Sequence, residues 1–163
     1  MITNKPNDKQ RMLDAEGYEI YNREVVRKVF PRIIADFKRE FPKAKVGDII
    51  PFYFALLSYV DGVERAQDGT LKTRFGACFL SQDELALMTG INKKRMPFLT
   101  EVLLANGLLA KVDRKYIAMQ QQLWYYPSWC PYVSEEGYVL DTNGERVVPD
   151  MQTLIAAYEK TRK

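Results

Sequence analysis

The hydrophobic and polar positions divide the chain into a polar start and a series of amphipathic segments. Residues 1–17 have no periodicity and are expected to form a flexible arm. From Asn22 to Pro42, apolar residues recur at helical spacing. Pro31 removes a backbone hydrogen bond within this pattern, so we expect a kink or two consecutive helices. The remaining positions are basic and form either a solvated face or a surface for phosphates or a second copy of the chain: Arg23, Arg27, Lys28, Arg32, Lys38 and Arg39.

A strongly apolar segment, Ile49 to Val60, predicts the central helix of the core. Asp48 precedes it and is expected to cap its first turn. Pro51 lies within that turn, where no acceptor exists for the missing donor, so it is tolerated. A polar loop follows, and residues 75–80 predict a short strand.

A further helix is predicted to begin at Ser81, because Ser81 and Glu84 form a capping box. It is expected to end at Thr89 and Gly90, since glycine accepts the left-handed conformation of a sharp exit. The residues expected to face the core are Leu85, Leu87 and Met88.

The next helix is predicted to start at Asn92, whose side chain can cap it, and to end at Asn106 and Gly107. Its buried face contains Met96, Leu99 and Leu103, with Ile91 just ahead. Pro97 and Phe98 are expected outside this face. A strand at 108–112, a turn at 113–115 and a strand at 116–119 are then predicted as a small hairpin.

These elements resemble the winged helix-turn-helix family of DNA-binding proteins. The resemblance rests on residues 89–94 (TGINKK) in the turn and 107–109 (GLL) before the hairpin, or wing. In this family the second helix enters the major groove, and the wing and first helix touch phosphate. The resemblance implies that Asn92, Lys93, Lys94 and Pro97 face the groove, with Arg95 at its edge. It implies backbone contacts from Gln82, Thr89, Lys111, Arg114 and Lys115.

One feature departs from the family pattern. Pro97 and Phe98 are apolar where recognition helices usually carry polar groups, and apolar groups read few base edges beyond a thymine methyl. Some winged helices bind protein instead. The alternative function is therefore a non-catalytic protein-protein interaction module.

The residues after Met119 predict an appended segment at 120–163. Residues 123–132 form an aromatic run punctuated by prolines, with no interleaved lysine or arginine. We expect this strap to cover the core; the alternatives are stacking platforms for unpaired bases or a partner-binding patch. A hairpin is predicted around Asn143 and Gly144, and Asp150 is expected to cap a last helix through Lys163, acting as a dimerisation element or a lid.

Composition narrows the possible chemistry. The chain has 163 residues, a net charge of +3, two cysteines and no histidine. Without histidine, Ser-His-Asp and Cys-His catalysis are excluded. Cys78 and Cys130 have no paired partner motif and are expected to be buried thiols. No phosphate loop, dinucleotide fingerprint, EF-hand or nucleophile elbow occurs. We therefore predict no enzyme activity, no cofactor and no metal.

Together these patterns predict an α+β fold, mostly helical, with a flexible arm at 1–17, a winged-helix domain with an N-terminal helical extension at 18–119, and the appended segment at 120–163 packed on the same domain. The expected function is double-stranded DNA binding. The architecture is similar to initiator and organiser proteins of plasmid, phage or mobile-element replication, and transcription regulation is the second role expected of such a module. Expected partners are duplex DNA, a second copy forming a homodimer, and a replication or regulatory protein. No membrane span or export signal is recognised, so a cytoplasmic location is expected.

Overall fold

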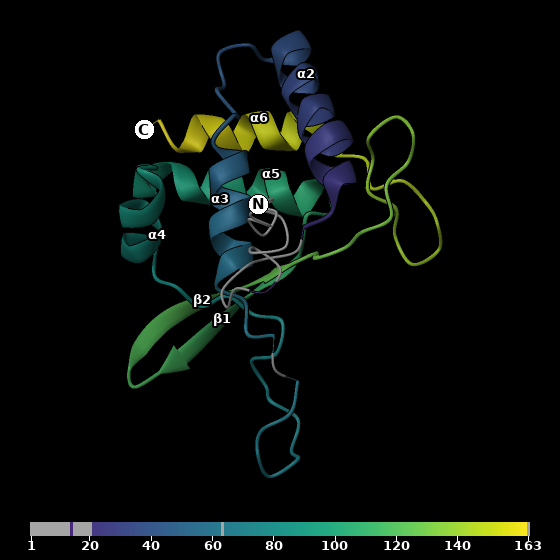
Figure 1. Cartoon of the computed structure of the whole chain (residues 1–163). Helices are drawn as coiled ribbons and strands as arrows, with labels where there is room; N and C mark the ends of the chain where they lie inside the picture. The colour runs from purple at the N-terminus through teal and green to yellow at the C-terminus, as the bar shows by residue number, and fades with distance from the viewer. Residues whose placement is uncertain (1–13, 15–20, 63, 163) are drawn as a thin grey trace, which may run out of the picture.

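The computed structural model describes residues 14, 21–62 and 64–162. The expected flexible arm at 1–17 lies outside this description apart from Asp14. Within the described residues the fold is α+β, with five α-helices and one two-stranded antiparallel sheet. The helices lie together on one side, and the β-hairpin projects beneath them (Figure 1).

The N-terminal helical segment consists of two consecutive helices. A π-helical segment, η1 (Val25–Val29), passes directly into α2 (Phe30–Glu40). Pro31 lies in the first turn of α2, where its missing N–H is tolerated. The expectation of two helices meeting near this proline is confirmed. Arg32 differs from expectation, because its side chain is only 9% exposed.

The central helix is α3 (Ile49–Ser58), which is buried along most of its length as expected. The prediction that Asp48 caps it is wrong, since the Asp48 side chain accepts no hydrogen bond from the helix. The carboxylate instead forms an ion pair with Arg95, far along the chain.

The helix α4 (Gln82–Thr89) has the predicted capping box. The Ser81 hydroxyl accepts from the Glu84 N–H at 3.2 Å, and the Ser81 N–H donates to the Glu84 carboxylate at 2.7 Å. Gly90 ends the helix with φ +72°. Leu87 and Met88 are 87% and 46% exposed, so the prediction that they face the core is wrong. A helix of two turns presents only Leu85 to the core, because its neighbours point elsewhere.

Asn92 caps the next helix as predicted, accepting from the Lys94 N–H at 2.9 Å. A short 3-10 segment, η2 (Lys93–Arg95), leads into α5 (Met96–Ala105). Phe98 was expected outside the buried face, but it is 1% exposed. Its ring packs against aromatic rings of α2 and of the C-terminal helix, which a helical repeat alone does not predict.

The hairpin is longer than expected. It pairs β1 (Leu109–Ile117) with β2 (Gln120–Pro127), and the turn is Ala118 and Met119, both with positive φ. The predicted turn at 113–115 is wrong, because those residues lie within β1. Burial of Tyr125 in the core holds β2 against the helices, which moves the turn along the chain. Much of the expected aromatic strap is therefore a strand.

A single β-bridge adds a third segment to the hairpin. The Cys78 N–H donates to the Tyr125 carbonyl at 2.7 Å, and the Tyr125 N–H donates back to Cys78 at 2.8 Å. The strand predicted at 75–80 is thus reduced to one bridging residue. From α3 onward the order is helix, bridge, helix, helix, strand, strand.

The C-terminal segment ends in α6 (Met151–Lys160), which Asp150 caps as predicted by accepting from the Gln152 N–H at 3.1 Å. α6 lies alongside α5 (Figure 1). The hairpin expected near Gly144 is a turn closed by one bridge, Leu140 to Arg146. Cys78 is buried, whereas Cys130 is exposed, which corrects the expectation of two buried thiols. No helix among the described residues has the length and apolar character needed to cross a bilayer.

Candidate nucleic-acid interface

The turn between α4 and α5 exposes two lysines at the N-terminal end of α5. Lys93 contacts α4 through an ion pair, with its Nζ 2.7 Å from an Asp83 carboxylate oxygen. Lys94 makes no ion pair with any described residue. The oxygen of the Asn92 side chain is occupied as the helix cap. Of the polar residues expected to face the groove here, Lys94 has the charge most available to an external anion.

Arg95 is held within the protein. Its guanidinium forms an ion pair with Asp48 and donates to the Lys45 carbonyl. These contacts join η2 to the loop that precedes α3. Arg95 therefore fixes the position of the two lysines before it, since the three residues share one short helical segment.

The outward face of α5 has no exposed basic residue. Pro97 is exposed, and Glu101 is exposed one turn later. The opposite side is covered, because Phe98 packs against Tyr158 of α6. The exposed positions of α5 thus carry a carboxylate and no basic residue.

Gln82 begins α4 and Thr89 ends it, so both lie within the helix-turn-helix segment. The Thr89 hydroxyl donates to the Leu85 carbonyl at 2.6 Å and accepts from the Ile91 N–H at 3.2 Å. It therefore shapes the turn. Gln82 is half-buried and lies beside the Tyr125 hydroxyl. That hydroxyl is buried and makes no hydrogen bond with any described residue. Burial raises the pKa of Tyr125, and the nearby Gln82 side chain opposes that change.

The three basic residues of the hairpin lie on two faces. Side chains alternate along a strand, so Lys111 and Lys115 share the outer face while Arg114 shares the face of Tyr125, which packs on the helices. The Lys111 Nζ is 3.1 Å from the Asp113 carboxylate. The expectation that all three reach one phosphate is modified, since Arg114 points to the helix side.

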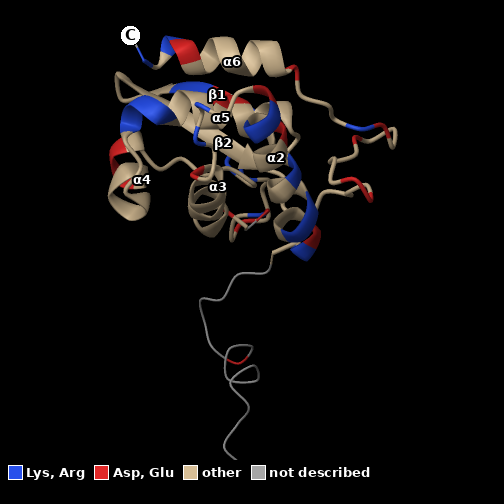
Figure 2. Ribbon diagram, turned by 90° about the horizontal axis from the view of Figure 1, so that it is seen from above, with Lys and Arg blue, Asp and Glu red and all other residues tan. Residues whose placement is uncertain are grey.

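A basic hollow lies beside η2 and was not predicted from the sequence. It has a volume of about 530 Å³ and is lined by Lys43, Lys45, Arg95, Tyr158 and Arg162. The residues come from the loop before α3, from η2 and from the end of α6. The Tyr158 hydroxyl donates to the Lys43 carbonyl at 3.3 Å, which joins two of these segments. Figure 2 shows basic residues of η2 and of the C-terminal end of α6 on the same side of the molecule.

No sequence signal could have found this hollow, because its basic residues come from three segments that are far apart in the sequence. The arrangement exists only because α6 packs along α5. In the described ranges, no three side chains of the metal-binding types come together. Comparison with protein-family models, characterised proteins and solved structures finds no match for the chain.

Proposed function

We propose that the protein is a winged helix-turn-helix protein that binds double-stranded DNA. The order of elements from α3 to β2 supports the fold, since a helix, a bridging segment, two helices and a hairpin follow in the order of a winged domain. The capping box and the Asn92 cap support the helix-turn-helix unit within it.

The observation that carries the proposal is the gathering of cations at the N-terminal end of α5. Lys94 is exposed there, and the basic hollow brings Lys43, Lys45 and Arg162 from two other segments to the same side. Cations from separate segments suit the extended row of phosphates on a duplex. Each phosphate that they neutralise releases counterions, which favours binding at low salt.

The proposed contacts are with phosphate more than with base edges. Lys93 and Lys94 contact the backbone near the N-terminal end of α5, and Arg114 contacts it from the hairpin. Asn92 and Pro97 border the groove, whereas Arg95, Gln82 and Thr89 hold the turn in position. Lys111 and Lys115 project from the other face of the hairpin. Glu101 on the outward face of α5 opposes deep entry of this helix into a groove.

The proposal is tested by fluorescence anisotropy with a labelled duplex across a salt series. We expect Lys94→Ala and Arg162→Ala each to lower affinity about five- to tenfold near 0.1 M salt, and to reduce the salt slope by about 1. Arg146→Ala is the matched control. Arg146 lies in the segment 132–148, on the opposite side of the molecule from α4 (Figure 1).

The absence of duplex binding at low salt would overturn the proposal. So would equal affinities for the wild type, Lys94→Ala, Arg162→Ala and the control. A footprint over repeated sites supports replication initiation, and a palindromic site beside a promoter supports transcription regulation. The roles in plasmid, phage or other mobile-element biology remain predictions, as does the cytoplasmic location.

The alternative function is a protein-interaction module, and the exposed apolar side chains of α4 favour it. Phe98, the residue first expected to serve this role, is buried. Leu87 and Met88 instead present an apolar contact surface, with a second copy of the chain as the expected partner. Sedimentation of wild-type protein and of Leu87→Gln tests this. A dimer that dissociates in the variant supports the alternative, and a wild-type monomer contradicts it.

A further inference from the structure

The outer face of the hairpin carries aromatic rings flanked by cations. The bridge between Cys78 and Tyr125 brings Phe79 beside Trp124, and their ring centroids are 5.7 Å apart. The Lys115 Nζ lies 5.5 Å from the Trp124 ring. On the other side, the Arg74 guanidinium lies 5.7 Å from the Phe79 ring. In this part of the face, two neighbouring rings therefore lie between two cations.

A second group of rings continues the same surface. Phe75 and Trp129 make an edge-to-face contact with centroids 5.9 Å apart. The backbone at Gly76 lies against Tyr126, since a Cβ there would be 3.9 Å from the Tyr126 ring. The Lys111 Nζ is 4.5 Å from the Tyr126 ring. We name this the aromatic surface, and its rings are Phe75, Phe79, Trp124, Tyr126 and Trp129.

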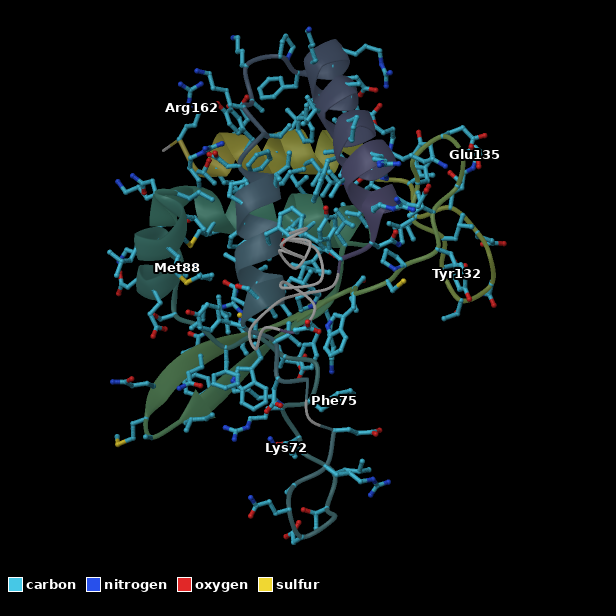
Figure 3. The ribbon with its side chains drawn as sticks, viewed as in Figure 1. Lys72, Phe75, Met88, Tyr132, Glu135 and Arg162 are labelled. Atoms are coloured by element: carbon cyan, nitrogen blue, oxygen red, sulfur yellow. The ribbon has the colours of Figure 1, made fainter. Side chains whose placement is uncertain are left out.

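The outer rings of the aromatic surface are partly open to solvent. Phe75, Phe79 and Trp129 are each 38–40% exposed, while Trp124 and Tyr126 form a floor between them. Figure 3 shows Phe75 and Lys72 on the loop beneath the hairpin, on the side away from the helices. Exposed rings that cluster in this way mark an interaction site more often than singly scattered ones.

Two carboxylates form ion pairs with Arg74 and Lys111 of the aromatic surface and with the neighbouring Lys72. Asp61 contacts Lys72 at 3.5 Å and Arg74 at 3.2 Å, and Asp113 contacts Lys111 at 3.1 Å. These ion pairs order the long basic side chains beside the rings. A ligand phosphate would join or replace these carboxylate contacts.

From this arrangement we propose that the aromatic surface binds an unpaired nucleic-acid strand. Exposed rings stack on bases, and neighbouring cations contact the phosphates between those bases. A duplex does not suit the rings, because its base faces are already stacked. The run 123–132 contains no interleaved basic residue, but β1 and the loop before α4 place basic residues beside its rings. This inference is independent of duplex binding at the α5 end.

The experiment measures binding of a fluorescent oligothymidylate to the full chain by anisotropy at low and moderate salt. We expect Phe75→Leu and Phe79→Leu each to weaken binding about 5- to 150-fold, because each removes one stacking contact worth about 1–3 kcal/mol. Leucine retains an apolar side chain, which protects the fold. Lys115→Ala should also weaken binding and reduce the salt slope. Tyr132→Ala is the matched control, since Tyr132 is 81% exposed on the far loop (Figure 3).

A second oligonucleotide separates stacking from charge. An abasic strand of the same length keeps its phosphates, so it should bind weakly and equally to wild type, Phe75→Leu and Phe79→Leu. An oligouridylate arm compares RNA with DNA. Thermal melting of every variant checks that the fold is retained.

The inference is overturned if oligothymidylate does not bind at low salt, or if Phe75→Leu and Phe79→Leu bind it as tightly as Tyr132→Ala does. It is also overturned if the abasic strand binds as tightly as oligothymidylate. Lys94→Ala should impair duplex binding alone. Wild-type protein that binds the single strand but no duplex would reject the proposed function and leave this inference intact. Wild-type protein that binds duplex but no single strand would reject this inference and leave the proposed function intact.

Discussion

The ring of Tyr158 on α6 lies 5.2 Å from the ring of Phe98 on α5, at an interplanar angle of 72°. Phe98 also contacts Phe37 of α2 edge to face, with centroids 5.9 Å apart. One side chain therefore joins three helices that are distant in sequence. This contact covers a side of α5 and holds the end of α6 beside η2, where the basic hollow forms.

Replacing Phe98 by alanine should lower the free energy of unfolding by about 3–5 kcal/mol, because it removes a buried ring and leaves a cavity between the three helices. Urea unfolding followed by circular dichroism measures the change. Glu101→Ala, at an exposed position of the same helix, should change stability by less than about 0.5 kcal/mol. Equal stabilities of the two variants would show that Phe98 is not part of the core.

Arg32 forms a second contact between distant segments, and its replacement by alanine should cost about 3–5 kcal/mol. Its guanidinium donates to Asp36 at 2.9 Å, to the Asn106 side chain at 2.8 Å and to the Gly137 carbonyl at 3.0 Å. Removing it leaves these buried acceptors with fewer donors. Urea unfolding again measures the loss.

Two further variants control for charge and for shape. Arg39 also pairs with Asp36, but its side chain is 67% exposed, so Arg39→Ala should destabilise the fold far less than Arg32→Ala. Arg32→Lys should restore little stability, since an ammonium cannot reproduce the planar fork of donors. Full rescue by lysine would contradict the role of this geometry.

Two glycines with positive φ should respond differently to alanine. A Cβ at Gly137 would lie 2.4 Å from the Lys28 carbonyl oxygen, whereas a Cβ at Gly144 would meet nothing within 4 Å. Gly144→Ala should therefore cost only the backbone strain of a left-handed residue, about 1–2 kcal/mol. Gly137→Ala should cost clearly more, because the backbone of η1 at Lys28 or the segment around Gly137 must also move. Thermal melting of both variants tests the difference, and equal melting temperatures would contradict it.

Stability should fall at high pH because of Tyr53. Burial raises the pKa of Tyr53 to about 12, and its hydroxyl donates to the Ser128 carbonyl at 2.8 Å. The folded state thus retains a proton that the unfolded state loses above its ordinary pKa of about 10. This contribution, about 2–3 kcal/mol, is complete below pH 10 and is lost as the pH rises to 12.

Urea unfolding between pH 9 and pH 12 measures this dependence, and Tyr53→Phe is the control. The variant lacks the ionisable hydroxyl, so its stability should decline less steeply over that range. Identical pH profiles for the two proteins would rule out a contribution from Tyr53.

The features that could be predicted from the sequence alone are those that local interactions set. The caps at Ser81, Asn92 and Asp150 were predictable because a side chain bonds to a backbone group two or three residues away. The end of α4 was predictable for a similar reason, because it depends on the positive φ of the single residue Gly90. The central helix followed from an apolar run too long to remain exposed. These features place the elements in order along the chain.

Long-range packing sets which surfaces those elements share. Phe98 and Arg32 are buried because α6 and the segment around Gly137 pack over them, and no local pattern encodes that packing. The position of the turn at Ala118 and Met119 follows from burial of Tyr125, which lies in β2. The basic hollow and the aromatic surface combine residues from several segments. Their existence depends on contacts between residues far apart in sequence, which periodicity and spacing cannot report.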